Sequence, residues 1–141
     1  MKNKTILGLE FGLYYSPNRS LPKEHEGTPY LHLSDNHYYT VLNDYCLLLG
    51  TCYSLCREAN NIDGWLWNIN EQIFLKRNQE YYGDNVCVFF TDDKVKLINY
   101  WDYEAGKENY CELTVEELRK LTTDWKWFVV EWEIKKIKGE I

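Results

Sequence analysis

Apolar residues occupy every second position near the start of the chain. They are Leu7, Leu9, Phe11, Leu13 and Tyr15. Side chains of a strand point alternately to its two faces, so this period predicts a half-buried β-strand that ends at the turn-forming residues 16–20. Residues 29–33 are expected to add a second, short strand.

The spacing of apolar residues then changes to steps of three and four. This stripe consists of Tyr38, Val41, Leu42, Tyr45, Cys46, Leu48, Leu49, Cys52, Leu55 and Cys56. Such steps place side chains on one side of a helix, so we expect a helix over residues 36–59 with Ser34 or Asp35 as its N-cap. The Asn-Asn and Asp-Gly pairs at residues 60–61 and 63–64 are expected to end it.

Residues 65–80 are ambiguous between helix and strand, because their apolar residues match neither period cleanly. One helical face would contain Leu66, Ile69, Ile73 and Arg77. This shared face favours a helix that closes at residues 83–84. A strand stays open as the alternative.

Two segments rich in β-branched and aromatic residues follow, at residues 85–91 and 94–101. The Asp-Asp pair between them, residues 92–93, is typical of a turn, so the two segments predict a β-hairpin. A polar loop over residues 102–109 and a third strand over residues 110–113 would extend the hairpin into an antiparallel meander.

The last element is predicted by a capping box formed by Thr114 and Glu117. A helix is therefore expected to begin at Val115, and its stripe continues through Leu118, Leu121, Trp125, Phe128 and Trp132. The complete order predicts a single α+β domain over residues 1–141. We expect an antiparallel β-meander of three or four strands packed against two to three helices.

The composition places the chain among cytoplasmic globular proteins. At 141 residues it can bury about two thirds of its unfolded surface without a disulfide or metal staple. We find no secretory signal near the first residues and no stretch of about 20 apolar residues that could cross a membrane. The five cysteines have no zinc-site spacing and are expected to be reduced.

The negative charge is concentrated in one stretch. The formal net charge is -6, and residues 80–112 contain eight acids against three bases. A local acidic field favours a basic partner and repels phosphate backbones, which argues against nucleic-acid binding. Tyr100, Trp101 and Tyr103 interleave with these acids, and exposed rings of this kind are typical of protein-binding surfaces.

Motifs for catalysis or cofactor binding are missing. His25, His32 and His37 are seven and five residues apart, which is not a metal-ligand spacing. The chain has no Gly-x-Gly-x-x-Gly, no Walker loop and no Gly-x-Ser-x-Gly motif. We therefore expect no catalytic residues, no cofactor and no metal. The alternative is a divalent-metal site made by the acids at residues 92–93, 102 and 104.

Residues 86–132 resemble the C-terminal half of small bacterial immunity proteins. The resemblance covers about a third of the chain. It lies in a hairpin that ends in an acidic aromatic stretch at residues 100–104, the sequence Tyr-Cys-Glu-Leu-Thr-Val-Glu-Glu-Leu at residues 110–118, and a helix with Trp125 and Phe128. These proteins neutralise the toxins of contact-dependent inhibition and other polymorphic toxin systems. The resemblance implies a non-enzymatic inhibitor that binds a cognate toxin domain, often a cationic nuclease.

The sequence therefore predicts an antitoxin that binds its toxin stoichiometrically through an acidic, aromatic-rich surface. The candidate partner-binding residues are Asp92, Asp93, Tyr100, Asp102, Tyr103, Glu104 and Glu108. The alternatives are a small metal-dependent enzyme, or enzyme subunit, that uses the acidic loop, and a non-catalytic adaptor or homo-oligomeric structural protein.

Overall fold

The structure is a computed structural model. It describes residues 4–6, 9–14, 28–32, 37–49, 57–83, 85–107 and 110–140. Its helices are α1 (His37–Leu49), α2 (Arg57–Leu75), α3 (Tyr100–Glu104) and α4 (Val115–Ile137). Its strands are β1 (Lys4–Ile6), β2 (Leu9–Tyr14), β3 (Thr28–His32), β4 (Glu80–Tyr82), β5 (Val86–Thr91), β6 (Lys94–Asn99) and β7 (Tyr110–Thr114).

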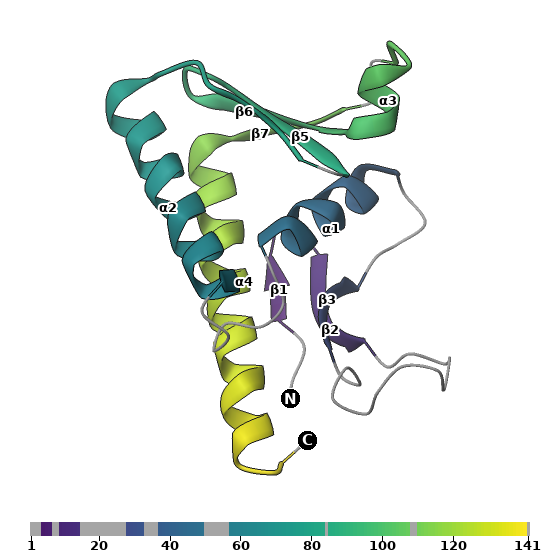
Figure 1. Ribbon diagram of the computed structural model, residues 1–141, viewed down its shortest axis with the longest axis vertical. Coiled ribbons are helices and arrows are strands. Elements are labelled where there is room, and N and C mark those ends of the chain that lie inside the picture. The colour runs from purple at the N-terminus through teal and green to yellow at the C-terminus, as the bar shows by residue number, and fades with distance from the viewer. Residues whose placement is uncertain are drawn as a thin grey trace.

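The strands form two antiparallel sheets, with the orders β1-β2-β3 and β4-β5-β6-β7. Helix α1 lies between the two sheets and contacts strands of both, while α2 and α4 lie side by side along one flank (Figure 1). The second sheet is a four-stranded meander in which each strand pairs with the next along the chain. The predicted α+β class is confirmed.

The hydrophobic core lies between the inner face of the meander and the three long helices. The strand residues of this core are Val86, Val88, Phe90, Val95, Leu97, Cys111 and Leu113. They follow the alternate spacing of a sheet with one buried face. The helices contribute residues at steps of three and four, among them Tyr45, Ile69 and Trp125.

A series of ring contacts connects the layers. The Trp65 ring of α2 lies 5.8 Å from the Tyr45 ring of α1 and 5.0 Å from the Tyr81 ring of β4. Tyr81 in turn lies 6.0 Å from Phe90 on β5. All three contacts are edge-on, and such aromatic pairs contribute about 0.5–1.5 kcal/mol each beyond area burial. The position of the meander on the helices is therefore fixed by specific contacts as well as by apolar burial.

Most local predictions in the described residues are confirmed. Strands β2, β3, β5, β6 and β7 lie where the sequence predicts strands. Helix α4 begins at Val115 behind a complete capping box, in which the Thr114 hydroxyl accepts from the Glu117 amide and the Glu117 carboxylate accepts from the Thr114 amide, both at 3.0 Å. The helix continues without a break to Ile137.

The predicted helix end at residues 60–64 is wrong, because α2 passes through these residues. The Asn and Gly residues there are poor helix formers, with a cost of about 1 kcal/mol for the glycine. Burial of Ile62, Trp65 and Ile69 against the core outweighs this cost. The helix predicted over residues 36–59 corresponds to α1 and to the first residues of α2, and residues 50–56 lie outside the described part.

Two further boundaries differ from the prediction. The helix favoured for residues 65–80 ends at Leu75, where Lys76 adopts a left-handed φ of 50°, and residues 80–82 form β4. Tyr100 and Trp101, expected at the end of a strand, begin α3, which continues into the expected polar loop. The Asn99 side chain explains this difference, since it accepts hydrogen bonds from the amides of Trp101 and Asp102.

One buried polar contact connects α1 to α4. The Tyr45 hydroxyl lies 2.8 Å from Thr122 Oγ1, which itself donates to the Leu118 carbonyl at 2.7 Å. Because the threonine proton is used in that second bond, Tyr45 must donate to Thr122. Burial raises the pKa of Tyr45 far above its usual value. The folded protein thus favours the neutral, protonated form of the Tyr45 side chain.

This contact predicts a loss of stability in alkaline solution. The pKa of Tyr45 is raised in the folded state, so its stabilising contribution is complete below about pH 10, the pKa of an unfolded tyrosine, and is lost as the pH rises further. We expect Tyr45→Phe to make the fall in the free energy of unfolding above that pH shallower, by up to about 1.4 kcal/mol per pH unit. Urea denaturation from about pH 8 to pH 11 measures this slope.

The matched control is Tyr110→Phe, which removes the hydroxyl of an exposed tyrosine on β7. We expect this variant to keep the slope of the unchanged protein. Equal slopes for Tyr45→Phe and the unchanged protein would contradict the account of the buried phenol.

Candidate functional site

Asp92 and Asp93 form the two-residue turn between β5 and β6. Three side chains from the segment before β4 hold this turn. Gln72 Nε2 donates to the Asp92 carbonyl at 3.0 Å, Asn78 Oδ1 accepts from the Asp92 amide at 3.0 Å, and Lys76 Nζ lies 2.8 Å from Asp93 Oδ1. Asp92 also adopts a left-handed φ of 52°. These contacts give the two residues a structural role, and Lys76 offsets the charge of Asp93.

Helix α3 presents the other predicted residues at the opposite end of the meander. Tyr100, Asp102, Tyr103 and Glu104 belong to this single turn of helix, which follows β6 directly. The six residues of β6 separate it from the Asp92–Asp93 turn. At about 3.3 Å per residue, this places the two groups about 20 Å apart. In Figure 1, α3 lies at the right-hand end of the meander and the end of α2, near the turn, lies at the left.

The predicted binding residues are therefore not one cluster. Asp92 and Asp93 lie at one end of the sheet, and the α3 residues lie at the other. Glu108 lies outside the described residues. Of the rings on α3, Trp101 is 69% exposed and Tyr103 is 40% exposed, whereas Tyr100 is half-buried.

The two groups flank one surface, the outer face of the meander, which points away from the core. Its side chains follow from the strand alternation and the register. They are Glu80, Tyr82, Cys87, Phe89, Thr91, Lys94, Lys96, Ile98, Tyr110 and Glu112. Cys87 and Ile98 belong to this outer face but are buried, because α3 packs over β5 and β6 at that end.

Three rings form a cluster where α3 meets the outer face. The ring centroids of Tyr82 and Phe89 lie 5.6 Å apart, those of Tyr82 and Tyr103 lie 5.7 Å apart, and those of Phe89 and Tyr103 lie 5.5 Å apart. We call this set the aromatic triangle. It attaches α3 to the sheet, and it stays open to solvent on one side, since Tyr82 is 54% exposed.

Carboxylates lie beside the aromatic triangle. The Tyr82 hydroxyl donates to Glu80 Oε2 at 2.7 Å. This bond and a further one between Tyr82 and Tyr103 raise the pKa of Tyr82 above its usual range. Within α3, the hydrogen bond to the Glu104 carboxylate raises the pKa of Tyr100. Both acids are thus held in place by tyrosine hydroxyls.

A shallow depression continues from the aromatic triangle toward the Asp92–Asp93 turn. Its volume is about 450 Å³, and it is lined by Phe89, Thr91, Asp92, Asp93, Lys94, Lys96 and Glu112. Phe89 belongs both to the depression and to the aromatic triangle. Beside the depression, the Lys96 ammonium lies 4.5 Å from the centre of the Tyr110 ring. The outer face therefore combines rings, acids and a few bases in one continuous surface.

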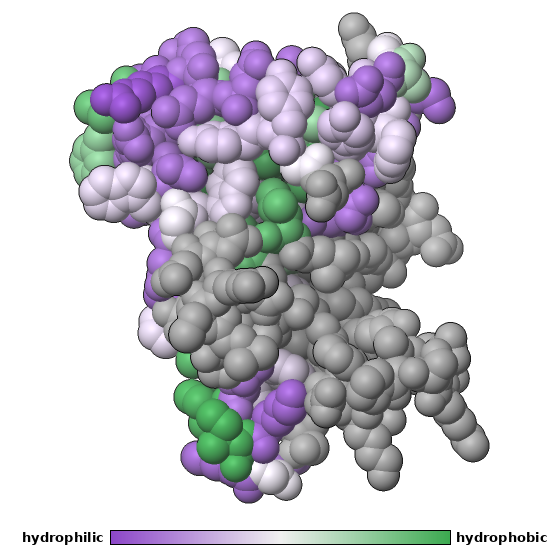
Figure 2. Space-filling view, viewed as in Figure 1, coloured by the Kyte–Doolittle hydropathy of each residue, from purple (hydrophilic) through white to green (hydrophobic). Residues whose placement is uncertain are grey.

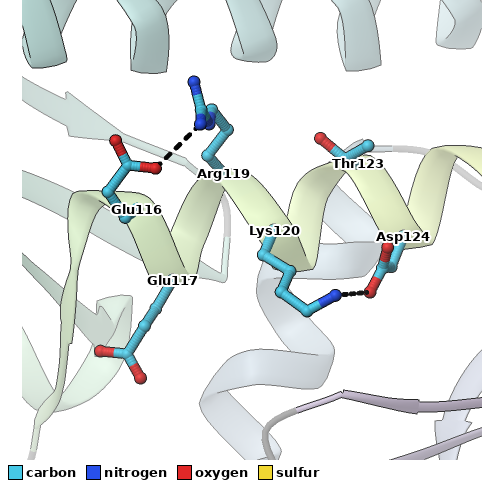
Figure 3. A pocket seen from close by; sticks show the side chains of 6 residues that line it. All are labelled: Glu116, Glu117, Arg119, Lys120, Thr123 and Asp124. Carbon is cyan, nitrogen blue, oxygen red and sulfur yellow. Dashed lines mark hydrogen bonds and ion pairs between the residues drawn. The ribbon is translucent and has the colours of Figure 1, made fainter.

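Helix α4 presents a second exposed surface that changes along its length. Figure 3 shows its first turns, where Glu116 pairs with Arg119 at 3.0 Å and Lys120 pairs with Asp124 at 3.0 Å beside an open depression. The same side of the helix becomes apolar in the last turns. There Trp127, Val130, Ile134 and Ile137 repeat at steps of three and four, and we call them the α4 stripe.

The α4 stripe is well exposed. Trp127 is 55% exposed and Ile137 is 77% exposed. Figure 2 shows the hydrophobic surface over the last turns of α4 at the lower left. The exposed charges of the first turns are explained by ion pairs within the helix, as on an ordinary solvated helix surface. The α4 stripe has no such explanation within the described residues.

We searched the described part of the chain for metal-binding groups, reactive thiols and membrane-spanning helices. No group of three His, Cys, Asp or Glu residues there could hold a metal ion. Burial raises the pKa of the Cys46 thiol well above its usual value, so it stays protonated and a poor nucleophile at neutral pH. No helix in this part is long and apolar enough to cross a membrane.

Comparison with protein-family models, curated proteins and solved structures finds no match for this chain.

Sequence reasoning missed Glu80, Tyr82 and Phe89 as site residues. Their signal was present in the alternation of β5, where Val86, Val88 and Phe90 point to the core and Phe89 must point away from it. The contribution of β4 is not predicted, because the sequence favours a helix over residues 65–80 and indicates no strand before residue 85.

The backbone conformation of Asp92 predicts a contrast between two substitutions. A φ of 52° suits glycine and is unfavourable for a β-branched residue. We expect Asp92→Gly to leave the free energy of unfolding unchanged or raise it by up to about 1 kcal/mol, and Asp92→Val to lower it by more than about 1 kcal/mol. Urea denaturation of the two variants measures the difference. Similar stabilities for both would contradict the left-handed turn.

Proposed function

We propose that the protein is an immunity protein, a non-enzymatic cytoplasmic antitoxin that neutralises a cognate bacterial toxin domain by stoichiometric binding. The binding surface is the outer face of the meander together with α3, and no cofactor takes part. The partner is a basic toxin domain such as a nuclease. This proposal combines the resemblance of residues 86–132 to immunity proteins with the surface chemistry of the described residues.

The observation that carries the proposal is the placement of exposed rings beside acids on a fixed support. Trp101 is 69% exposed and Tyr103 is 40% exposed on a helical turn that Asn99 caps and the aromatic triangle attaches to the sheet. Tyr and Trp are the residues most often found at the energetic centre of protein interfaces, because they bury large area with little loss of side-chain entropy. Exposure of these rings to water does not stabilise the free protein, so a binding partner would explain it.

The charge of this surface suits the kinetic demand on an antitoxin. Glu80, Asp102, Glu104 and Glu112 lie on α3 and the outer face, and Lys94 and Lys96 are the bases of that face. An acidic field steers a cationic partner and raises the association rate, while buried rings slow dissociation. Fast association and slow dissociation are what a cell needs when its own toxin is present.

The alternative of a metal-dependent enzyme requires acids that lie close together, and the acids considered for it do not. It requires Asp92 and Asp93 to act with Asp102 and Glu104, and the two pairs lie at opposite ends of β6. Metal ligands must lie within about 2.0–2.6 Å of one ion. These four acids therefore cannot make one site in this fold.

The proposal is tested with a candidate toxin domain, which we expect to be the variable C-terminal domain of a large secreted protein encoded directly upstream of this gene. We expect the double variant Asp102→Lys and Glu104→Lys to lower the association rate at low salt by about 10-fold or more and to weaken binding by about 100-fold. We expect Trp101→Ala to weaken binding by about 30-fold, mainly through faster dissociation. Surface plasmon resonance at two salt concentrations gives both rates.

The matched control is the double variant Glu116→Lys and Glu140→Lys, which makes the same change in net charge on α4 and just beyond its C-terminal end. We expect its association rate to stay within about 3-fold of the unchanged protein. Equal effects of the two double variants, or no binding of the toxin domain by the unchanged protein, would reject the proposal.

A second candidate, a non-catalytic adaptor that self-associates, is favoured by the α4 stripe. Exposed apolar residues at steps of three and four match the spacing of a helix that pairs with another helix. In this case we expect the protein to be dimeric at micromolar concentration in sedimentation equilibrium, and Ile134→Glu to make it monomeric. A monomer before any substitution would remove this candidate and leave the antitoxin proposal unaffected.

A further inference from the structure

The aromatic triangle and its neighbouring carboxylates have the composition of a site for one cationic side chain. Tyr82 and Tyr103 leave part of their rings open to solvent, and Phe89 lies between them and the depression. The three rings are tilted to one another by 55–68°, so they do not stack into a closed block. Ring faces carry negative potential, which attracts a cation held within about 6 Å of the ring centre.

Two carboxylates lie next to these rings. Glu80 is the register partner of Phe89 across β4 and β5, and its Oε2 is fixed by the Tyr82 hydroxyl. Glu104 follows Tyr103 directly, and its charge acts on Cys87, which is the register partner of Tyr82. Both carboxylates therefore lie at the border of the aromatic triangle.

These carboxylates have no cationic partner among the residues that the structure describes. Among the described residues, no lysine or arginine lies within ion-pair distance of Glu80 or Glu104. The nearest base in the register is Lys96, which pairs with Phe89 across β5 and β6 and lies over the Tyr110 ring instead. The outer face thus already holds one cation on one ring, and none of its described bases lies over the aromatic triangle.

We propose that the aromatic triangle, with Glu80 and Glu104 beside it, receives an arginine side chain of the toxin domain. This inference rests on the proposed function, because it names the chemistry by which that surface recognises its partner. A guanidinium fits better than an ammonium for two reasons. It is planar and stacks on rings, and it can donate hydrogen bonds sideways to carboxylates while it is stacked.

Charge complementarity identifies the occupant as a cationic protein segment. An apolar segment would desolvate Glu80 and Glu104 without supplying a charge to offset theirs, which is costly. An acidic segment would be repelled by both. An arginine satisfies the rings and the acids together, and its carboxylate contacts strengthen as the partner excludes water.

The test uses the full chain labelled with nitrogen-15 and two short peptides, acetyl-Gly-Arg-Gly-Arg-Gly-amide and its lysine counterpart. We expect the arginine peptide to shift the amide resonances of Tyr82, Phe89 and Tyr103, and the lysine peptide to bind at least about 3-fold more weakly. Shifts confined to other surfaces, or equal affinity for the two peptides, would overturn the inference.

Two variants and two matched controls localise the effect. Glu80→Gln keeps every ring in place and Tyr103→Leu removes one of them, and each should weaken binding of the arginine peptide by at least about 3-fold. Glu116→Gln and Trp127→Leu remove an exposed acid and an exposed ring on α4, and they should leave the affinity within about 1.5-fold. An unchanged affinity in Glu80→Gln, whose fold is not at risk, would also overturn the inference.

The toxin domain separates failure of this inference from failure of the proposed function. If the toxin domain binds the unchanged chain but is insensitive to replacement of each of its exposed arginines by lysine, the antitoxin proposal stands and the arginine site is wrong. If the arginine peptide binds at the aromatic triangle but the toxin domain does not bind at all, the site stands and the antitoxin proposal is wrong.

Discussion

The packing of α3 against the outer face of the meander is the contact on which the candidate site depends. Without it, Trp101 and Tyr103 would belong to a polar loop with no fixed position, and Cys87 and Ile98 would be exposed. This turn of helix is held by the Asn99 cap at its start, by the hydrogen bond from the Tyr100 amide to the Asn85 carbonyl, and by the aromatic triangle at its side. A helix of five residues has almost no stability of its own, so its position depends on these tertiary contacts.

The same physical logic divides the acidic residues of the chain into two groups. Asp92 and Asp93 are engaged by Gln72, Lys76 and Asn78, and their position fixes the hairpin that supports the sheet. Glu80 and Glu104, by contrast, accept hydrogen bonds from the hydroxyls of Tyr82 and Tyr100 and are exposed to solvent. The acidic stretch of the sequence thus contains carboxylates that stabilise the fold and carboxylates that could contact a partner. The contacts of each residue in the structure distinguish the two kinds.

The local elements with strong periodic signals could be predicted from the sequence. The alternation in β2, the hairpin of β5 and β6, and the capping box of α4 all agree with the structure, because each depends on neighbouring residues. Two of the failures occur where tertiary packing decides. Burial of Ile62, Trp65 and Ile69 carries α2 through a segment of poor helix formers, and the register of β4 against β5 brings Tyr82 and Glu80 to a surface that the linear sequence does not reveal.

For the candidate site, the sequence predicts the residues of α3 and their chemistry, but it groups them with a turn about 20 Å away across β6. The spatial neighbours of α3 come instead from β4 and β5. A surface assembled from strands and a helical turn in this way has no compact sequence motif.

The central claim is that a basic toxin domain covers α3 and the outer face of the meander. Hydrogen–deuterium exchange of the chain, alone and mixed with the cognate toxin domain, tests it most directly. The account predicts slower exchange of the backbone amides of α3 and β4 in the complex, with α4 beyond Lys126 unchanged. Protection confined to the α4 stripe, with α3 and β4 exchanging as in the free protein, would contradict it.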